Sequence, residues 1–200
     1  MATTSPLRIG IDFDNTIVSY DELFRSVAIE QRLVPESVPA SKTEVRNYLR
    51  NAGKEDAWTA MQGLVYGKRM PEAKAFPGVI DFIRACYRAE IPVFIASHRT
   101  KFPIVGESVD LHASALDWLR LQGIPDFIPA ERIYFELTKE AKLEQIRHHA
   151  FTHFIDDLPE FLTMPAFALS TQRILFNPQD APVAPLAPKC QYQMWSNLPT

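Results

Sequence analysis

Compact runs of apolar residues alternate along the chain with longer stretches in which apolar positions recur at helical spacing. The compact runs are rich in β-branched and aromatic side chains and predict buried strands. They are residues 8–13 (RIGIDF), 92–97 (PVFIAS), 132–136 (RIYFE), 153–157 (HFIDD) and 173–176 (RILF). Helical spacing predicts helices at residues 21–33, 41–49, 55–66, 79–89, 112–121 and 139–148. Strands that alternate with helices are typical of the α/β class with a mostly parallel sheet.

About seventy residues, nearly all helical in pattern, separate Asp14 from the strand that ends at Ser97. Because connections in compact domains are usually short, a small helical insert over one end of the sheet explains this interval better than a loop. We predict a core at residues 1–18 and 72–180, the helical insert at 19–71 and a Pro-rich tail at 181–200. The tail lacks periodicity, so we expect an extended strap or partial disorder there.

Composition narrows the classes of function. With 46% hydrophobic residues the 200-residue chain can bury a core, and its formal charge of −3 argues against nucleic-acid binding by bulk electrostatics. No GxGxxG or GxxxxGKS/T run is present, which removes the main support for a dinucleotide or P-loop site. Cys86 and Cys190 are far apart, so neither a disulfide framework nor structural zinc is expected. Without a signal-peptide pattern or a long apolar segment, we expect a cytoplasmic protein with no membrane contact.

Two acids stand at the end of the first predicted strand. In Asp12-Phe13-Asp14-Asn15-Thr16 the acids are two positions apart, so their side chains would point to the same face at the end of the strand. Ligands of open α/β sheets bind beyond the carboxyl ends of the strands. The alternative is that Asp14 or Asn15 only caps the helix that follows.

The ends of two other predicted strands also carry polar side chains. PVFIAS ends in the hydroxyl of Ser97, and HFIDD ends in Asp156 and Asp157. Three strand ends that carry groups suited to phosphate and metal are hard to attribute to capping alone. Four carboxylates in one place would repel one another and raise one another's pKa unless a cation lies among them.

These segments together resemble the four motifs of the haloacid dehalogenase (HAD)-like superfamily. DFDNT is similar to the first motif, DxDxT/V, and FIASH is similar to the second, a hydrophobic strand that ends in Ser or Thr. A lysine in the helix at 139–148 is similar to the third motif, and FIDD to the acidic fourth. Order and spacing agree over residues 7–180, and AFPGV resembles the family's return from its cap into the core. The resemblance implies an α/β, Rossmann-like three-layer core with a mostly parallel sheet and a small helical cap insert.

The resemblance also implies roles for individual residues. Asp12 would be the nucleophile that attacks phosphorus, and Asp14 would protonate the leaving oxygen and then activate water. Ser97 would hydrogen-bond the phosphoryl group, and the lysine would neutralise charge on it. The family pattern assigns Mg²⁺ to Asp12, the backbone carbonyl of Asp14, and Asp156, with Asp157 in or near the coordination sphere.

Two lysines fit the third motif, and the sequence leaves the choice open. Lys139 fits a K-x-x-x-L pattern that ends at Leu143, and Lys142 fits a K-x-x-x-I pattern that ends at Ile146. We favour Lys142 as the catalytic lysine because it lies nearer the acidic strand. The simpler alternative for either residue is an exposed helix lysine.

Further side chains are candidates for contact with the substrate. We assign Thr16, His98, Arg99 and Lys139 to substrate binding, although Arg99 could equally pair with a local carboxylate. In the insert, residues 68–69 (KR) could reach a second anionic group, but a solvated surface is the simpler interpretation.

Other conspicuous side chains fit a structural role better. Trp58 and Tyr66 lie at helical spacing in the insert, which favours packing. His148, His149 and His153 straddle a helix end and a strand start, so we do not expect them to converge on zinc. The core is expected to include Phe102, Phe161 and Phe167.

We therefore expect a Mg²⁺-dependent phosphatase that hydrolyses a small phosphomonoester, such as a sugar phosphate or nucleotide, through an aspartyl-phosphate. Asp14 favours phosphate chemistry, because the dehalogenases of the resembled family lack this second acid. The alternatives are a phosphotransferase that uses the same intermediate and a non-catalytic phosphate-binding or assembly protein. The expected partner is a small phosphorylated metabolite, and the sequence is silent on oligomeric state.

Overall fold

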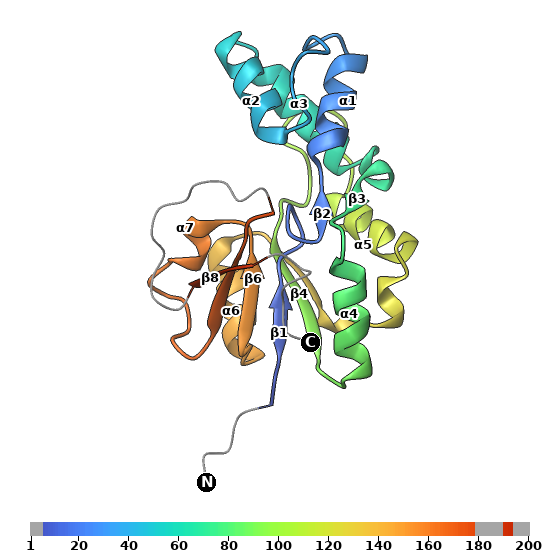
Figure 1. Ribbon diagram of the computed structural model, residues 1–200. Coiled ribbons are helices and arrows are strands. Elements are labelled where there is room, and N and C mark those ends of the chain that lie inside the picture. Colours follow the sequence, from blue (N-terminus) through green and yellow to red (C-terminus); the bar gives the residue numbers. More distant parts are fainter. Residues whose placement is uncertain (1–5, 179–189, 194–200) are drawn as a thin grey trace. The chain divides into compact units, whose positions relative to one another are not determined.

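The computed structural model describes residues 6–178 and the backbone of residues 190–193. The chain divides into two compact units (Figure 1). The first unit comprises Met1–Ile17, Ala75–His98 and Ile124–Thr200, and the second comprises Val18–Lys74 and Arg99–Gly123. The second unit thus holds the region expected as a helical insert together with an additional segment, Arg99–Gly123.

Six strands form one sheet in the first unit. In spatial order they are β5 (Ile133–Glu136), β4 (Val93–His98), β1 (Ile9–Ile11), β6 (His153–Asp156), β7 (Gln172–Phe176) and β8 (Cys190–Gln193). Every neighbouring pair is parallel, which confirms the predicted α/β class and sheet type. β8 falls in the Pro-rich tail, where no strand was predicted because the sequence there has no alternating pattern.

Helices cover both faces of this sheet. α6 (Lys139–His148) and α7 (Pro159–Leu162) pack on one face, around a cluster that includes Phe94 and Ala96 of β4. Side chains alternate along a strand, so the intervening residues of β4 point to the other face, where α4 (Val79–Arg88) packs (Figure 1). Two 3-10 helices, Ile124–Asp126 and Ala130–Arg132, precede β5.

Gly10, in the centre of β1, allows two aromatic rings to lie directly against the backbone. A Cβ atom at this position would lie 2.4 Å from Cδ2 of Phe151 and 2.6 Å from Cδ2 of Phe154. Both rings are buried in the aromatic cluster under α6 and α7. Because such a core is close-packed, neither ring can move away without displacing its neighbours.

Gly10→Ala is therefore expected to lower the free energy of unfolding by about 2–3 kcal/mol, because the added methyl group overpacks the core. Urea denaturation measures the loss. The matched control is Gly10→Ala/Phe151→Leu, in which the smaller side chain relieves the contact; its loss should be less than the sum of the two single losses. A Gly10→Ala protein within about 0.5 kcal/mol of the parent would contradict this account.

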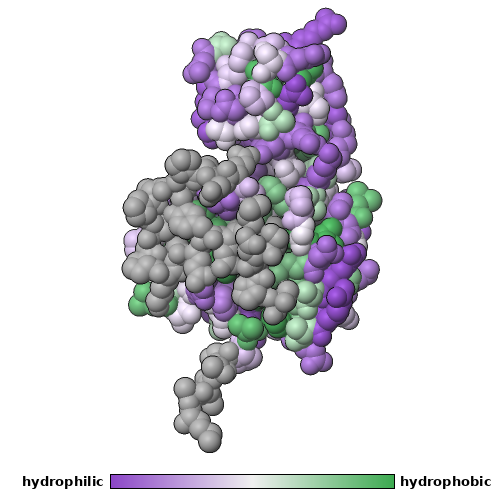
Figure 2. All heavy atoms as spheres, viewed as in Figure 1, coloured by the Kyte–Doolittle hydropathy of each residue, from purple (hydrophilic) through white to green (hydrophobic). Residues whose placement is uncertain are grey.

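The second unit is mainly helical. Its elements are α1 (Asp21–Glu30), α2 (Lys42–Asn51), α3 (Glu55–Tyr66), the 3-10 helix Met70–Glu72 and α5 (Leu111–Leu121). Ser41 caps α2 by accepting a hydrogen bond from Glu44 N at 3.3 Å, with the Ser-x-x-Glu spacing of a capping box. Hydrophilic side chains are spread over the visible face of α1 and α2 (Figure 2). β2 (Val18–Ser19) and β3 (Lys74–Ala75) form a two-stranded ribbon too short to be seen in the sequence pattern.

Packing explains why Arg99–Gly123 groups with these helices. α5 contacts α3 and the 3-10 helix, and the indole Nε1 of its Trp118 donates a hydrogen bond of 2.9 Å to the carbonyl of Ala73. The order of segments along the chain gave no sign of this pairing. It depends on an aromatic side chain that reaches a backbone carbonyl distant in sequence.

Aromatic side chains form the core of the second unit. Trp58 stacks on Phe24 with ring centroids 4.9 Å apart, and Tyr66 contacts Tyr20 edge to face at the same distance, which confirms the predicted packing role. Phe102 is 50% exposed, so its prediction as a core residue is wrong. No helix in the described part of the chain is long and apolar enough to cross a membrane.

Candidate functional site

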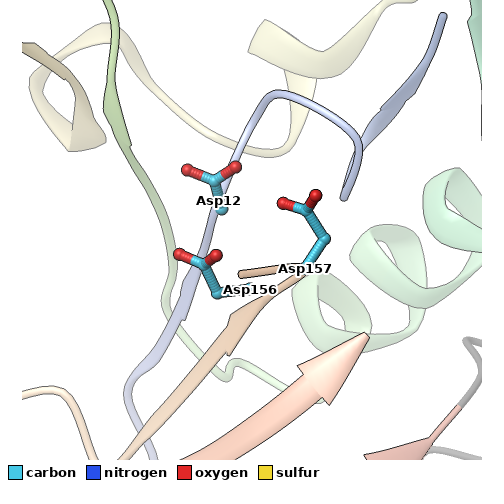
Figure 3. Close-up of side chains that lie close together, drawn as sticks. All are labelled: Asp12, Asp156 and Asp157. Atoms are coloured by element: carbon cyan, nitrogen blue, oxygen red, sulfur yellow. The ribbon is translucent and has the colours of Figure 1, made fainter. Parts of the chain in front are cut away.

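The carboxyl ends of β1 and β6 bring three aspartates together. Asp12 directly follows β1 and donates its backbone N–H to the Ile155 carbonyl of β6 at 2.9 Å. Asp156 ends β6, and Asp157 follows it. One carboxylate oxygen from each of the three lies within 4.8 Å of the others (Figure 3). We call the ends of β1, β4 and β6, with the residues that follow them, the carboxyl edge.

Lys142 lies between two of these aspartates. Its Nζ donates to Asp12 Oδ1 at 2.6 Å and to Asp156 Oδ2 at 2.5 Å, and its side chain is 3% exposed. The second oxygen of Asp156 accepts the backbone N–H of Leu158 at 2.8 Å. Both oxygens of Asp156 therefore already have donors, which leaves Asp12 and Asp157 as the side chains better placed to meet a further cation.

The structure distinguishes the two candidate lysines by their surroundings. Lys142 is on the buried side of α6, next to Leu143 and Ile146. Lys139 is one turn earlier and 35% exposed, and its Nζ is 4.0 Å from the Glu160 carboxylate. Of the two, Lys142 is the one that reaches Asp12.

Burial dominates the electrostatics of Asp12. Loss of solvent raises its pKa, the positive charge of Lys142 lowers it, and the negative charges of Asp156 and Asp14 raise it again, to a value of about 7. The pKa of Lys142 is raised, because attraction to Asp12 and Asp156 outweighs the cost of burying its charge. One lysine charge thus serves two buried carboxylates, with two more acids nearby.

In the absence of metal, the stability that Asp12 contributes is expected to fall as the pH rises from about 4 to about 7. The folded pKa lies above the unfolded value of 3.8, so the folded protein binds this proton more tightly, and the advantage disappears as the pH passes through the folded pKa. Thermal unfolding in EDTA between about pH 5 and about pH 8 measures this dependence. The side-chain amide of the Asp12→Asn variant does not titrate, so the Tm of that variant should fall less over the range. The same slope in both proteins would contradict a raised pKa.

Ser97 and Thr16 place hydroxyl groups at the same edge. The Ser97 side chain is 1% exposed, and its Oγ has no hydrogen-bond partner among the described residues. A buried hydroxyl without a partner is costly, so a ligand that accepts its hydrogen bond would remove that cost. Thr16 is buried and donates to Asp157 Oδ1 at 3.4 Å. Asp14 is half-buried, close enough for its charge to act on Asp12.

His98 ends β4 at this edge and faces charged neighbours. Burial lowers its pKa, as do the charges of Lys142 and Lys139, whereas a hydrogen bond with the backbone of Leu137 and the charge of Asp14 raise it. His98, assigned to substrate binding from the sequence, thus lies at the carboxyl edge.

Arg99 belongs to the second unit. Its guanidinium is buried and donates to the carbonyls of Tyr66 at 2.8 Å and Leu111 at 3.2 Å, and to the Tyr20 hydroxyl at 3.4 Å. These bonds tie α3 and α5 to the residue before α1. These hydrogen bonds give Arg99 a structural role, and substrate binding by Arg99 stays a prediction.

Two features of the site were not found in the sequence. The rings of Phe161 and Phe154 lie 4.2 and 5.2 Å from Lys142 Nζ, so aromatic faces also line the lysine. The Leu158 backbone N–H binds Asp156. The apolar residues after FIDD were the available signal for a short helix here, but its four residues are too few to show a period.

His148, His149 and His153 are not part of a group that could hold a metal among the described residues. Among the described residues, the group of acids and histidines that could hold a metal is Asp12, Asp156 and Asp157. His153 binds Thr152 at 3.0 Å, whereas His148 and His149 contact each other at the end of α6. Lys68 and Arg69 pair with glutamates of their own unit, Glu107 for the first and Glu30 and Glu72 for the second.

No protein-family model matches this chain, and no curated protein matches it. Solved structures do match. A predicted phosphoglycolate phosphatase from Haemophilus somnus is 13% identical with a TM-score of 0.61, and the match covers 98% of this chain and 97% of that one. A HAD-superfamily hydrolase of subfamily IA, variant 1, from Geobacter sulfurreducens is 14% identical with a TM-score of 0.58, covering 96% of each chain.

A HAD family hydrolase from Deinococcus radiodurans, with bound phosphate and sodium, is 15% identical with a TM-score of 0.53, over 90% of this chain and 84% of that one. At such low identity the likeness concerns the fold. The chain has the α/β fold of HAD-like hydrolases, which confirms the predicted fold resemblance.

Proposed function

We propose that this protein is a phosphatase that hydrolyses a small phosphomonoester at the carboxyl edge. The observation that carries the proposal is the buried Lys142, whose Nζ bonds both Asp12 and Asp156 beside the carboxylate of Asp157. Burying a cation and two carboxylates has a large desolvation free energy. The attraction within a structural ion pair usually does not recover this free energy. Strongly perturbed, paired groups of this kind are typical of catalytic sites.

Each side chain at the edge has a step that its chemistry allows. A carboxylate oxygen of Asp12 attacks phosphorus, the bond to the leaving oxygen breaks, and Asp14 gives that oxygen a proton. Asp14 then takes a proton from water, whose oxygen attacks phosphorus and releases phosphate from Asp12. Ser97 Oγ donates a hydrogen bond to the phosphoryl oxygens, and Lys142 offsets their charge.

We propose Mg²⁺ as the cofactor. Hard oxygen ligands suit Mg²⁺, and Asp12, Asp157 and the backbone carbonyl of Asp14 would hold it, with Asp156 next to them. The residues fit such an ion because one lysine does not balance four acids at this edge, and Asp12 resists ionising without further positive charge. When bound, the ion would supply charge stabilisation for the transferring phosphoryl group.

The similar solved structures support the proposal that this protein is a phosphatase. The similar proteins are HAD hydrolases, one of them is a predicted phosphoglycolate phosphatase and another holds phosphate. From these similar proteins we take only the class of substrate that we propose for this chain, a small phosphorylated metabolite. Location in the cytoplasm stays a prediction from the sequence.

The proposal is tested by measuring phosphate release from a panel of sugar phosphates, nucleotides and aryl phosphates, with Mg²⁺ and with EDTA. We expect at least one substrate whose hydrolysis requires Mg²⁺. Release that occurs only when an alcohol acceptor is present would identify a phosphotransferase instead. If no phosphoester reacts and inorganic phosphate still binds, the protein is a phosphate-binding protein and the proposal is wrong.

A further inference from the structure

A pocket lies at the far end of α6 from Lys142. It has a volume of about 740 Å³, and its lining comes from α6 and β5: Tyr134, Glu144, Gln145, Arg147, His148 and His149. This volume is within the range of small-molecule sites. The first unit alone supplies these residues, and none of them belongs to the carboxyl edge.

The half-buried part of the lining is aromatic. The His149 ring stacks on Tyr134 with centroids 4.8 Å apart, and His148 meets His149 edge to face at 4.7 Å. Burial, and the charges of His148 and Arg8, lower the pKa of His149, so this ring is neutral at pH 7 and packs as an aromatic plate. The Tyr134 hydroxyl donates a hydrogen bond to the Glu131 carbonyl, and this bond holds the ring in place.

The exposed part of the lining is charged, and two further arginines lie near it. Arg147 pairs with Glu144 and donates to the Ala166 carbonyl at 3.2 Å. Beyond His149, the guanidinium groups of Arg8 and Arg132 lie 5.2 and 5.5 Å from the centre of the Phe94 ring. The Nε of Arg8 is buried without a hydrogen-bond partner among the described residues.

These residues share a place in the topology. Arg8 precedes β1, Arg132 precedes β5, and His148 and His149 end the helix that leads to β6. In a parallel sheet all of these positions lie at the amino ends of the strands. Three arginines therefore gather at the end of the sheet opposite to the acids, next to an aromatic-lined pocket.

We propose that this pocket, which we call the α6–β5 pocket, is a second ligand site that binds a nucleoside phosphate. The His149 ring packs between Tyr134 and the rings of Phe94 and Phe151, which supports Tyr134 from behind. The ring of Tyr134 suits stacking with a nucleobase, and Arg147, supported by the nearby arginines, suits the phosphate. The side-chain amide of Gln145 donates to Glu136 at 2.7 Å, so the base is held mainly by stacking. Binding should therefore discriminate little between purine bases.

The test is isothermal titration of the whole chain with ADP in EDTA, with adenosine and inorganic phosphate as separate arms. We expect ADP to bind more tightly than either fragment. Arg147→Gln should weaken ADP binding about tenfold through loss of a charged hydrogen bond, and Tyr134→Leu should weaken it by a similar factor through loss of stacking. Tyr134→Phe, which keeps the ring, should bind almost as the parent does.

The matched control for the arginine is Arg84→Gln. Arg84 also sits on an exposed helix face and pairs with an acid one turn away, Asp81, but it lies outside the pocket. It should leave ADP binding unchanged, and Asp12→Asn should do the same. Loss of ADP binding in Asp12→Asn but not in Arg147→Gln would place the nucleotide at the carboxyl edge and overturn the proposal. Equal affinity for ADP and phosphate, or no binding of ADP at millimolar concentration, would also overturn it.

Discussion

Replacing Asp12 with asparagine is expected to reduce Mg²⁺-dependent phosphate release by at least about 10³-fold, the scale on which loss of a nucleophile acts. The amide keeps the size of the side chain and still offers an oxygen to Lys142, but it cannot form the acyl-phosphate. Lys142 also keeps its 2.5 Å contact with Asp156. Fold and stability should therefore persist while turnover is lost, and steady-state phosphate release with the best substrate of the panel measures the effect.

Asp81→Asn is the matched control for this experiment. Asp81 is an exposed aspartate on α4, 84% accessible at its side chain, and the change should leave the rate at the parent value. If Asp12→Asn hydrolyses an aryl phosphate as fast as the parent, the proposed nucleophile is wrong. If instead it loses activity together with its folded circular dichroism spectrum, the contact with Lys142 is needed for folding, and Asp12→Glu then tests the chemistry with the charge retained.

Replacing Lys142 with methionine is expected to lower the free energy of unfolding by about 3–5 kcal/mol at pH 7 in EDTA. The methionine side chain fills much the same volume, but it leaves Asp12 and Asp156 buried without a cation. Uncompensated buried charge is more costly than the loss of the ion pair itself. Urea denaturation measures the loss, and phosphate release should fall as well, because the phosphoryl charge is no longer offset.

Two comparisons separate this explanation from simple repacking. Lys139→Met, one turn away on the exposed side of α6, should change stability by less than about 0.5 kcal/mol. The loss in Lys142→Met should shrink as the pH falls from about 7 to about 5, because protonation removes the carboxylate charges that the lysine had balanced. A loss that is the same at both pH values would indicate a packing defect instead.

Local sequence pattern predicted the longer helices of both units because each of them carries its signal within a short stretch of chain. The helix α6 is bounded by residues 139 and 148 as its pattern predicts, and α3 likewise matches residues 55–66. Both helices have an apolar face within a dozen positions; in addition, Thr138 caps α6 and Gly67 follows the last residue of α3. Two-residue strands and the four-residue α7 have too few positions to display a period, so they were missed.

The site followed a similar division. That acids and a hydroxyl stand at strand ends is evident from the order of residues, because an apolar run and the polar residue after it are neighbours in sequence. Which lysine contacts the acids depends on how α6 is rotated against β4 and β5. The sequence pattern does not reveal this rotation, because Lys139 and Lys142 both fit the motif. The rotation is set by burial of Leu143 and Ile146, which carries Lys142 inward with them.

By itself, then, the sequence determined the alternation of strands and helices, the α/β class and the four acids at strand ends. Each of these depends on residues close together in the chain. The tertiary structure alone decided the strand order that places β1 between β4 and β6, the contact of Lys142 with Asp12, the grouping of Arg99–Gly123 with the helical unit, and the pocket at the end of α6. These depend on packing between residues far apart in sequence, and no local pattern encodes which distant surfaces will meet.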